Sequence, residues 1–93
     1  MRKGRPKYPQ PREVGPVLKA LQFHFPESEI SWETRESIKH VPCRRISGVT
    51  NEKKWIVDVY RGGFMYAQVE STSESFTSLF LLLNFLKRWL LNN

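Results

Sequence analysis

The chain has 93 residues, 40% of them hydrophobic, and a formal net charge of +6 at pH 7. This length supports one small domain with one core, and the single cysteine excludes an intrachain disulfide framework and fits a reducing compartment. The basic, proline-rich N-terminus lacks the apolar segment of a signal peptide, and the apolar C-terminal run is shorter than the roughly 20 residues of a membrane span. We therefore expect a soluble intracellular protein of the cytoplasm or nucleus, without a membrane partner.

Most of the net charge lies in the first twelve residues. They carry five bases and no acid, whereas the remaining 81 residues carry ten basic and nine acidic groups, which gives +1. The segment also holds three prolines and no large apolar residue except Tyr8, so it has almost nothing to bury. We expect residues 1–12 to form a disordered basic tail and residues 13–93 to form a single domain.

Arg2-Lys-Gly-Arg-Pro-Lys7 in this tail resembles an AT-hook, a short motif with a Gly-Arg-Pro core between basic residues. The resemblance implies that Arg5 lies deep in the minor groove of A·T-rich DNA, where the negative potential is strongest. The bases that it assigns to nucleic-acid contact are Arg2, Lys3, Arg5 and Lys7. The alternative, a solvated basic tail, stays open.

A short helix and a strand follow the tail. Pro16 suits the first turn of a helix that Pro26 ends, and the apolar residues from Val17 to Phe25 lie on one side of it. Residues 30–38 alternate between apolar and polar side chains, which predicts a half-buried strand with a polar outer face. Ile30, Trp32 and Thr34 would share the face opposite Ser31, Glu33 and Arg35.

Residues 39–54 give the weakest pattern. Ile46 to Val49 could form a short strand, and Pro42 interrupts any strand or places it on an edge. His40 and Cys43 have a spacing that occurs in metal sites, but only His24 remains as a further nitrogen or sulfur ligand, so we expect no metal. Nothing near Cys43 would orient it as a nucleophile.

A hairpin and a long helix complete the chain. Trp55–Tyr60 reads as a strand, and Gly62 and Gly63 supply the positive φ of a tight turn. Phe64–Glu70 alternates as a second strand, with Met65, Ala67 and Val69 on one face and Tyr66, Gln68 and Glu70 on the other. Ser71–Glu74 matches a capping box, which places the start of a helix there. The apolar residues of that helix that would cover the sheet are Phe76, Leu79, Phe80, Leu83, Leu86 and Leu90.

These elements predict an α+β fold, in which a helix precedes a three-stranded antiparallel sheet and a long C-terminal helix packs on one face. The sequence shows no glycine-rich phosphate loop, no paired catalytic carboxylates and no Ser/His/Asp group. We therefore expect a binding protein that is not an enzyme, with no catalytic residue and no cofactor.

Two family resemblances begin at Ser47. Ser47-Gly-Val49, Lys54–Val59, the glycine turn and Tyr66–Glu70 resemble the APETALA-type and integrase arm-binding domains. Those domains place a three-stranded sheet in the DNA major groove. The resemblance implies contact by basic residues that share one exposed face of that sheet or lie beside it and, at the sugar-phosphate backbone, by two aromatic residues. These residues are Arg44, Arg45, Lys53, Lys54 and Arg61, with Trp55 and Tyr60.

The second resemblance covers nearly the whole domain. The order of helix, three strands and helix looks like a double-stranded-RNA-binding domain, a family that presents basic residues at the start of its last helix. This chain has no lysine in the corresponding segment, residues 73–76. Degenerate domains of this kind resemble ones that contact proteins.

The last helix has more apolar residues than one sheet can cover. Such a surplus favours a homodimer or another protein partner, unless the first helix covers it. The residues that we assign to this interaction surface are Leu81, Leu82, Phe85 and Trp89. The leading prediction is a small nucleic-acid-binding protein with phosphate-driven contacts, with DNA favoured over RNA. Its alternatives are the degenerate RNA-binding-like domain and the dimerisation or interaction module.

Overall fold

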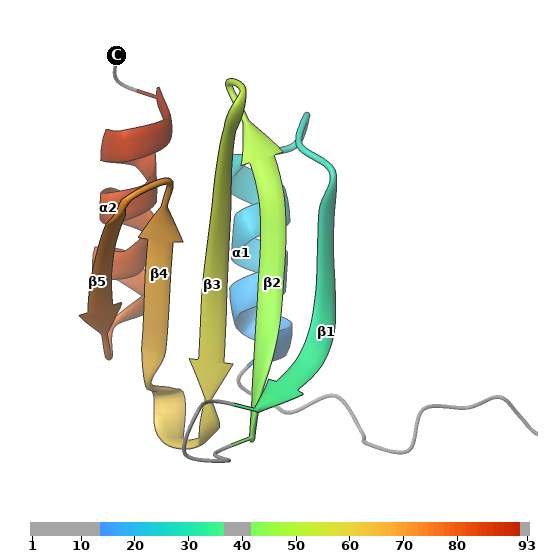
Figure 1. Ribbon diagram of the computed structural model, residues 1–93, viewed down its shortest axis with the longest axis vertical. Coiled ribbons are helices and arrows are strands. Elements are labelled where there is room, and N and C mark those ends of the chain that lie inside the picture. Colours follow the sequence, from blue (N-terminus) through green and yellow to red (C-terminus); the bar gives the residue numbers. More distant parts are fainter. Residues whose placement is uncertain (1–13, 37–41, 92–93) are drawn as a thin grey trace, which may run out of the picture.

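The computed structural model describes residues 14–36 and 42–91, which form one five-stranded antiparallel sheet and two α-helices. The elements are α1 (Val14–His24), β1 (Ile30–Glu36), β2 (Pro42–Thr50), β3 (Lys53–Tyr60), the 3₁₀ turn η1 (Arg61–Gly63), β4 (Met65–Val69), β5 (Thr72–Phe76) and α2 (Leu79–Leu91). The strands lie in chain order, so β1 and β5 are the edges. Both helices lie on the same face of the sheet (Figure 1). Neither helix covers the other face, which we call the open face.

Alternation along the strands sends apolar side chains to the helix side. In β4, Met65, Ala67 and Val69 are buried as predicted, and in β3 the same face carries Trp55, Val57 and Val59. The predicted alternation of Ile30–Arg35 is confirmed, since Ile30 and Trp32 pack against the core. Leu21 and Phe25 of α1, together with Leu82, Leu86 and Leu90 of α2, complete this core.

The predicted three-stranded sheet is wrong, because the sheet has five strands. One added strand is β5, where Ser71–Glu74 matched a capping box. Glu70 at φ 54° turns the chain back, and β5 pairs along the whole of β4. Helix α2 begins only at Leu79, and the Ser78 hydroxyl accepts a hydrogen bond from the Leu81 N–H at 3.3 Å. The capping signature depends only on neighbouring residues. Pairing with β4 outweighs it, because that pairing buries Phe76.

The other added strand is β2, which is longer than the short strand predicted at Ile46–Val49. Pro42 stands at its first residue, a position where the missing N–H is tolerated. The hairpin from β3 to β4 closes through η1 instead of a two-residue turn, although Gly62 and Gly63 have the predicted positive φ.

Trp55 occupies the centre of the core. It lies opposite Gly48 of β2, and its indole crosses the space that a side chain at Gly48 would fill. Its Nε1–H donates a hydrogen bond to the Thr50 hydroxyl at 3.0 Å, and its ring lies 6.3 Å from the ring of Phe25. Gly48 therefore serves the packing of Trp55.

We predict that Gly48→Ala destabilises the domain by about 1–3 kcal/mol, because a rigid ring cannot yield to the added methyl group. A Cβ there would lie 2.6 Å from Trp55 Cζ2. Gly15→Ala is the matched control, since a Cβ at Gly15 meets nothing within 4 Å. Alanine at that helical position should be neutral or stabilising by up to about 1 kcal/mol. Urea unfolding measures both changes, and equal effects would contradict the role given to Gly48.

Candidate functional site

The open face of the sheet has a row of charged and aromatic side chains at its centre. Strand pairing forms a row across the sheet, in which each residue lies opposite the next. The row contains Glu33 of β1, Arg45 of β2, Asp58 of β3 and Tyr66 of β4. Asp58 is only 4% exposed although it lies on this face. A carboxylate that is so shielded from water requires a partner.

Arg45 is that partner. Its Nε and Nη2 groups donate hydrogen bonds to the two carboxylate oxygens of Asp58 at 2.8 and 3.0 Å. This two-pronged geometry is the strong form of an arginine–carboxylate pair. The hydrogen bond to Asp58 raises the pKa of Arg45 above its already high ordinary value. Arg45 therefore joins β2 to β3 and is not a free cation for phosphate.

Cys43 and Tyr60 lie opposite each other, each two residues along its strand from Arg45 and Asp58 respectively. Burial raises the pKa of the Cys43 thiol above 9.0, and the charge of Asp58 adds to the shift. The thiol is therefore protonated at neutral pH, the form that is neither a nucleophile nor a metal ligand. Burial likewise raises the pKa of Tyr60.

Aromatic rings and an arginine gather where β3 passes into β4. Tyr60 and Phe64 have ring centroids 5.9 Å apart, and Phe64 is 44% exposed. Tyr66 lies half-buried on the same open face, and Arg61 of η1 is exposed beside them in the chain. We call Tyr60, Arg61, Phe64 and Tyr66 the aromatic end. Sequence reasoning missed Phe64 and Tyr66 as site residues, although the alternation already placed Tyr66 on the outer face.

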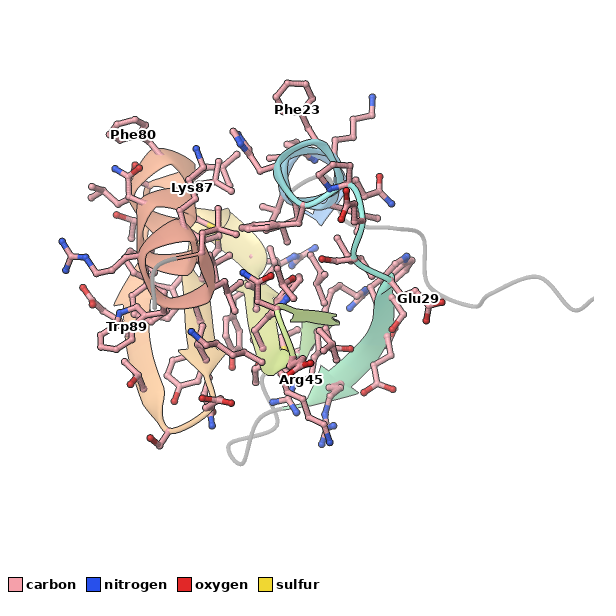
Figure 2. All side chains as sticks on the ribbon, turned by 90° about the horizontal axis from the view of Figure 1, so that it is seen from above. Phe23, Glu29, Arg45, Phe80, Lys87 and Trp89 are labelled. Carbon is pink, nitrogen blue, oxygen red and sulfur yellow. The ribbon has the colours of Figure 1, made fainter. Side chains whose placement is uncertain are left out.

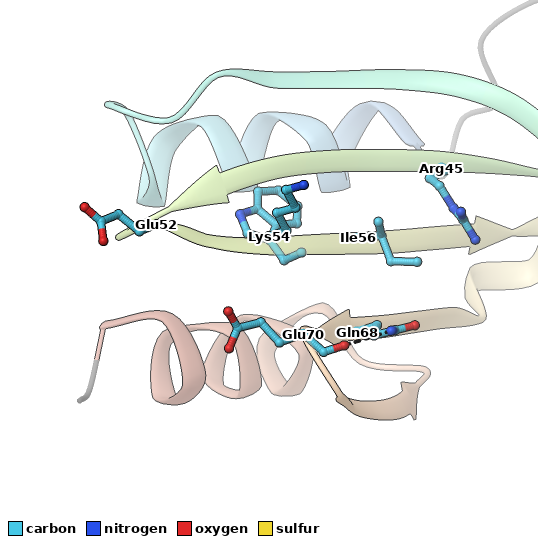
Figure 3. Close-up of a pocket in the computed structure, with 7 residues that line it drawn as sticks. Arg45, Glu52, Lys54, Ile56, Gln68 and Glu70 are labelled. Atoms are coloured by element: carbon cyan, nitrogen blue, oxygen red, sulfur yellow. Dashed lines mark hydrogen bonds between the residues drawn. The ribbon is translucent and has the colours of Figure 1, made fainter.

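A shallow groove of about 590 Å³ crosses the opposite end of the open face (Figure 3). Its lining residues are Arg45, Glu52, Lys54, Trp55, Ile56, Gln68 and Glu70. Arg45 is already paired with Asp58, which leaves Lys54 against Glu52 and Glu70, so the groove has no excess positive charge with which to attract phosphate. Lys54 is exposed on this face, as a nucleic-acid contact would require.

The prediction that the five basic residues of the middle segment share one exposed face is wrong. Consecutive strand residues alternate, so Arg44 faces the helices opposite Val59 while Arg45 faces away. Arg61 lies in η1, beyond the end of β3. Trp55, predicted to touch the nucleic-acid backbone, is 2% exposed and belongs to the core.

Lys53 holds the end of α2. Its ammonium group donates a hydrogen bond to the Trp89 carbonyl at 2.9 Å, and the Asn51 side-chain amide donates one to the Leu90 carbonyl at 2.7 Å. Helix C-termini leave such carbonyls unpaired, and a cation there also favours the helix dipole. The turn between β2 and β3 thus caps a helix almost 40 residues further along the chain.

The predicted interaction surface on α2 divides into two parts. Leu82 is 0% exposed and Phe85 8% exposed, so both belong mainly to the domain core. Leu81 and Trp89 are 53% and 41% exposed. Phe80, predicted to cover the sheet, is instead 71% exposed and points away from it (Figure 2).

The predicted tail contacts Arg2, Lys3, Arg5 and Lys7 lie outside the described residues, as does His40. Among residues 14–36 and 42–91, no three His, Cys, Asp or Glu side chains are placed to hold a metal ion. Within the same ranges, no helix is both long and apolar enough to span a membrane. No protein-family model matches the chain, and neither does any curated protein or solved structure. The family resemblances therefore stay predictions.

We predict that Arg45→Ala destabilises the domain by about 2–4 kcal/mol, because it leaves the buried Asp58 carboxylate unpaired. Replacing Arg45 and Asp58 together with valine should recover most of that loss. Arg35→Ala is the control, since its pair with Glu33 is largely exposed and should change stability by less than about 1 kcal/mol. Urea unfolding tests the set, and a double variant no better than Arg45→Ala would contradict this account.

We also predict that stability falls at alkaline pH. The pKa values of Cys43 and Tyr60 are raised above 9.0 and 10.0 by burial. The folded state then holds these protons more tightly than the unfolded state. The resulting contribution to stability is complete below the pKa values of the unfolded state, and it is lost as pH rises through the pKa values of the folded state. Urea unfolding at about pH 8 and about pH 10.5 measures it. The fall should be smaller in Cys43→Ala with Tyr60→Phe, and an identical fall would refute the assignment.

Proposed function

We propose that this chain is a nucleic-acid-binding protein without enzymatic activity, which binds through its basic N-terminal segment and the aromatic end of its open sheet face. The observation that carries the proposal is the aromatic end, where Phe64 and two tyrosines lie on a sheet face that no helix covers. Such rings stack on nucleic-acid bases, and a neighbouring arginine contributes a cation.

The distribution of charge supports the basic segment as the main phosphate contact. The described residues carry nine bases and eight acids, so the domain itself is nearly neutral. Two of those bases, Arg45 and Lys53, already donate hydrogen bonds to other groups of the domain. Residues 1–12 carry five bases without an acid. Phosphate-driven affinity therefore depends on that segment.

The position of α1 supports joint use of the two parts. Helix α1 begins at Val14, at the end of the domain where η1 and the aromatic end lie (Figure 1). The described part of the chain thus begins at that end. One nucleic-acid strand could contact both the rings and the basic segment.

The preference for DNA over RNA now rests on the Gly-Arg-Pro segment alone. The Ser47-Gly-Val49 pattern contributes to the resemblance to DNA-binding sheets, but Gly48 lies inside β2 and packs against Trp55, which accounts for the glycine without DNA. Base stacking on aromatic rings favours single strands of either kind, because every base has a stacking face. We propose single-stranded nucleic acid as the ligand of the aromatic end.

Fluorescence anisotropy with labelled single-stranded DNA, single-stranded RNA and both duplexes, over a series of salt concentrations, tests the proposal. Deleting residues 1–12 should weaken binding and should also make affinity less dependent on salt concentration, by the equivalent of up to about five phosphate contacts. Phe64→Ala should weaken single-strand binding by about 1–3 kcal/mol. The deletion should leave the melting temperature unchanged.

Phe80→Ala is the matched control, because it removes an exposed ring from the helix side of the domain. It should leave affinity unchanged. Dissociation constants above tens of micromolar for every nucleic acid at low salt would overturn the proposal. Equal losses from Phe64→Ala and Phe80→Ala would overturn the part given to the aromatic end.

A further inference from the structure

The edge of the molecule formed by β5 and α2 combines an unpaired strand with exposed apolar side chains. β5 has β4 on one side and no described strand on the other. Two grooves run along this edge, one beside the first half of β5 and one beside the second, and Arg88 lines both. In Figure 2 the Trp89 side chain lies on this flank of α2, whereas Phe80 points away from the sheet. We call β5 with Leu81, Phe85, Arg88 and Trp89 the edge strip.

The strand of the edge strip can accept another strand. In an antiparallel ladder, every second residue of an edge strand directs its N–H and C=O groups away from the sheet. These groups are a template for pairing unless the edge is shielded. β5 runs from Thr72 to Phe76, so alternate residues of this stretch offer their backbone groups along this side.

The apolar side chains of α2 in the edge strip are spaced at nearly the same interval as side chains on one face of a strand. Leu81, Phe85 and Trp89 are four residues apart, which corresponds to about 6 Å along a helix. Side chains on one face of a strand repeat every 6.6 Å or so. The Phe85 ring lies 5.3 Å from Phe76 and 6.5 Å from Trp89, which continues the apolar line along the strip. A strand added to β5 would lie beside this line.

We propose that a second copy of this chain pairs with the edge strip, so that the two sheets join through their β5 strands and the two α2 helices lie side by side. The geometry favours a second copy because strand and helix share one centre. Glu74 is the middle residue of β5, Phe85 is the middle residue of α2, and both line the same groove. One two-fold axis through that point superposes both elements on their copies, as an isologous interface requires.

On either side of this axis, different apolar residues of the two copies meet. Antiparallel α2 helices that cross at Phe85 place Leu81 of each copy against Trp89 of the other. These are the exposed apolar residues of the flank, at 53% and 41%. The pairing would therefore cover the part of the predicted interaction surface that the core does not use.

The charges of the edge strip are also balanced in this arrangement. Glu74 and Arg88 line one groove, and neither forms an ion pair with another described residue. Two copies bring two acids and two bases to the axis. The two Glu74 carboxylates lie closest to it, so each needs an Arg88 nearby. This requirement makes Arg88 a specific test of the interface.

The interface is small. It consists of one strand of five residues and one flank of α2, which places it toward the small end of specific interfaces. We therefore expect a dimer with a dissociation constant in the micromolar range. The inference does not depend on nucleic-acid binding, since the edge strip is distinct from both the basic segment and the aromatic end.

Sedimentation equilibrium of the full chain, over concentrations from about 1 to 500 µM, measures the dimer. Leu81→Glu and Arg88→Glu should each raise the dissociation constant by about tenfold or more, because the first places a charge at an apolar contact and the second sets a like charge beside Glu74. Glu74→Gln should leave it unchanged or lower it. Phe80→Glu is the matched control, with a charge on the same helix but away from the strip, and should change it by less than about threefold.

Circular dichroism of the same samples identifies any variant that fails to fold. Arg88 is exposed and has no described ion pair, so Arg88→Glu keeps the test decisive if Leu81→Glu unfolds. A wild-type chain that stays monomeric at the highest concentration would overturn the proposal. So would equal effects of Phe80→Glu and Arg88→Glu. Deleting residues 1–12 should leave the dimer unchanged while it weakens nucleic-acid binding, which separates this inference from the proposed function.

Discussion

The close approach of Trp55 to Gly48 is the contact on which the arrangement of this domain depends. The indole lies across the bare backbone of β2 and reaches both Phe25 of α1 and the hydroxyl of Thr50. Thr50 in turn lies 2.7 Å from the Ser28 hydroxyl, in the connection between α1 and β1. One side chain therefore fixes the first helix, the following turn and two central strands. Any larger residue at position 48 would separate them.

This arrangement concentrates apolar side chains on the helix side of the sheet and leaves the open face to polar groups. Asp58 lies on that face almost without exposure, and Arg45 neutralises it with two hydrogen bonds. A small domain has few residues with which to join strands on an uncovered face. Arg45 and Lys53 are accordingly structural, although their type suggested contact with phosphate. The position of a charge in the fold, and not its presence in the sequence, decides whether it is free to bind.

The two proposals describe a protein whose functional surfaces lie around a neutral core. The basic segment and the aromatic end would contact nucleic acid, and the edge strip would join two copies. A dimer would carry two basic segments, so a ligand long enough to reach both would bind with increased avidity. Neither surface requires the groove on the open face, which has no excess of positive charge.

Some features followed from the sequence because they depend only on neighbouring residues. The alternation of Met65, Ala67 and Val69 predicted which side of β4 is buried, and that of Ile30–Arg35 did the same for β1. Gly62 and Gly63 indicated a turn with positive φ, which the structure has. The alternation of a strand and the conformational freedom of a glycine depend only on residues a few positions away. Such signals can be read without knowing the rest of the fold.

Other features were decided only by tertiary structure. Ser71–Glu74 has the local pattern of a helix start, yet Thr72–Phe76 forms β5 because β4 offers a complete ladder and a place for Phe76. Arg44 and Arg45 lie in a strand because β2 pairs with both β1 and β3, and consecutive strand residues then face opposite sides. Lys53 was assigned to nucleic acid, whereas its partner is a carbonyl 36 residues away. These outcomes depend on contacts between distant segments, and a single sequence carries no local signal for such contacts.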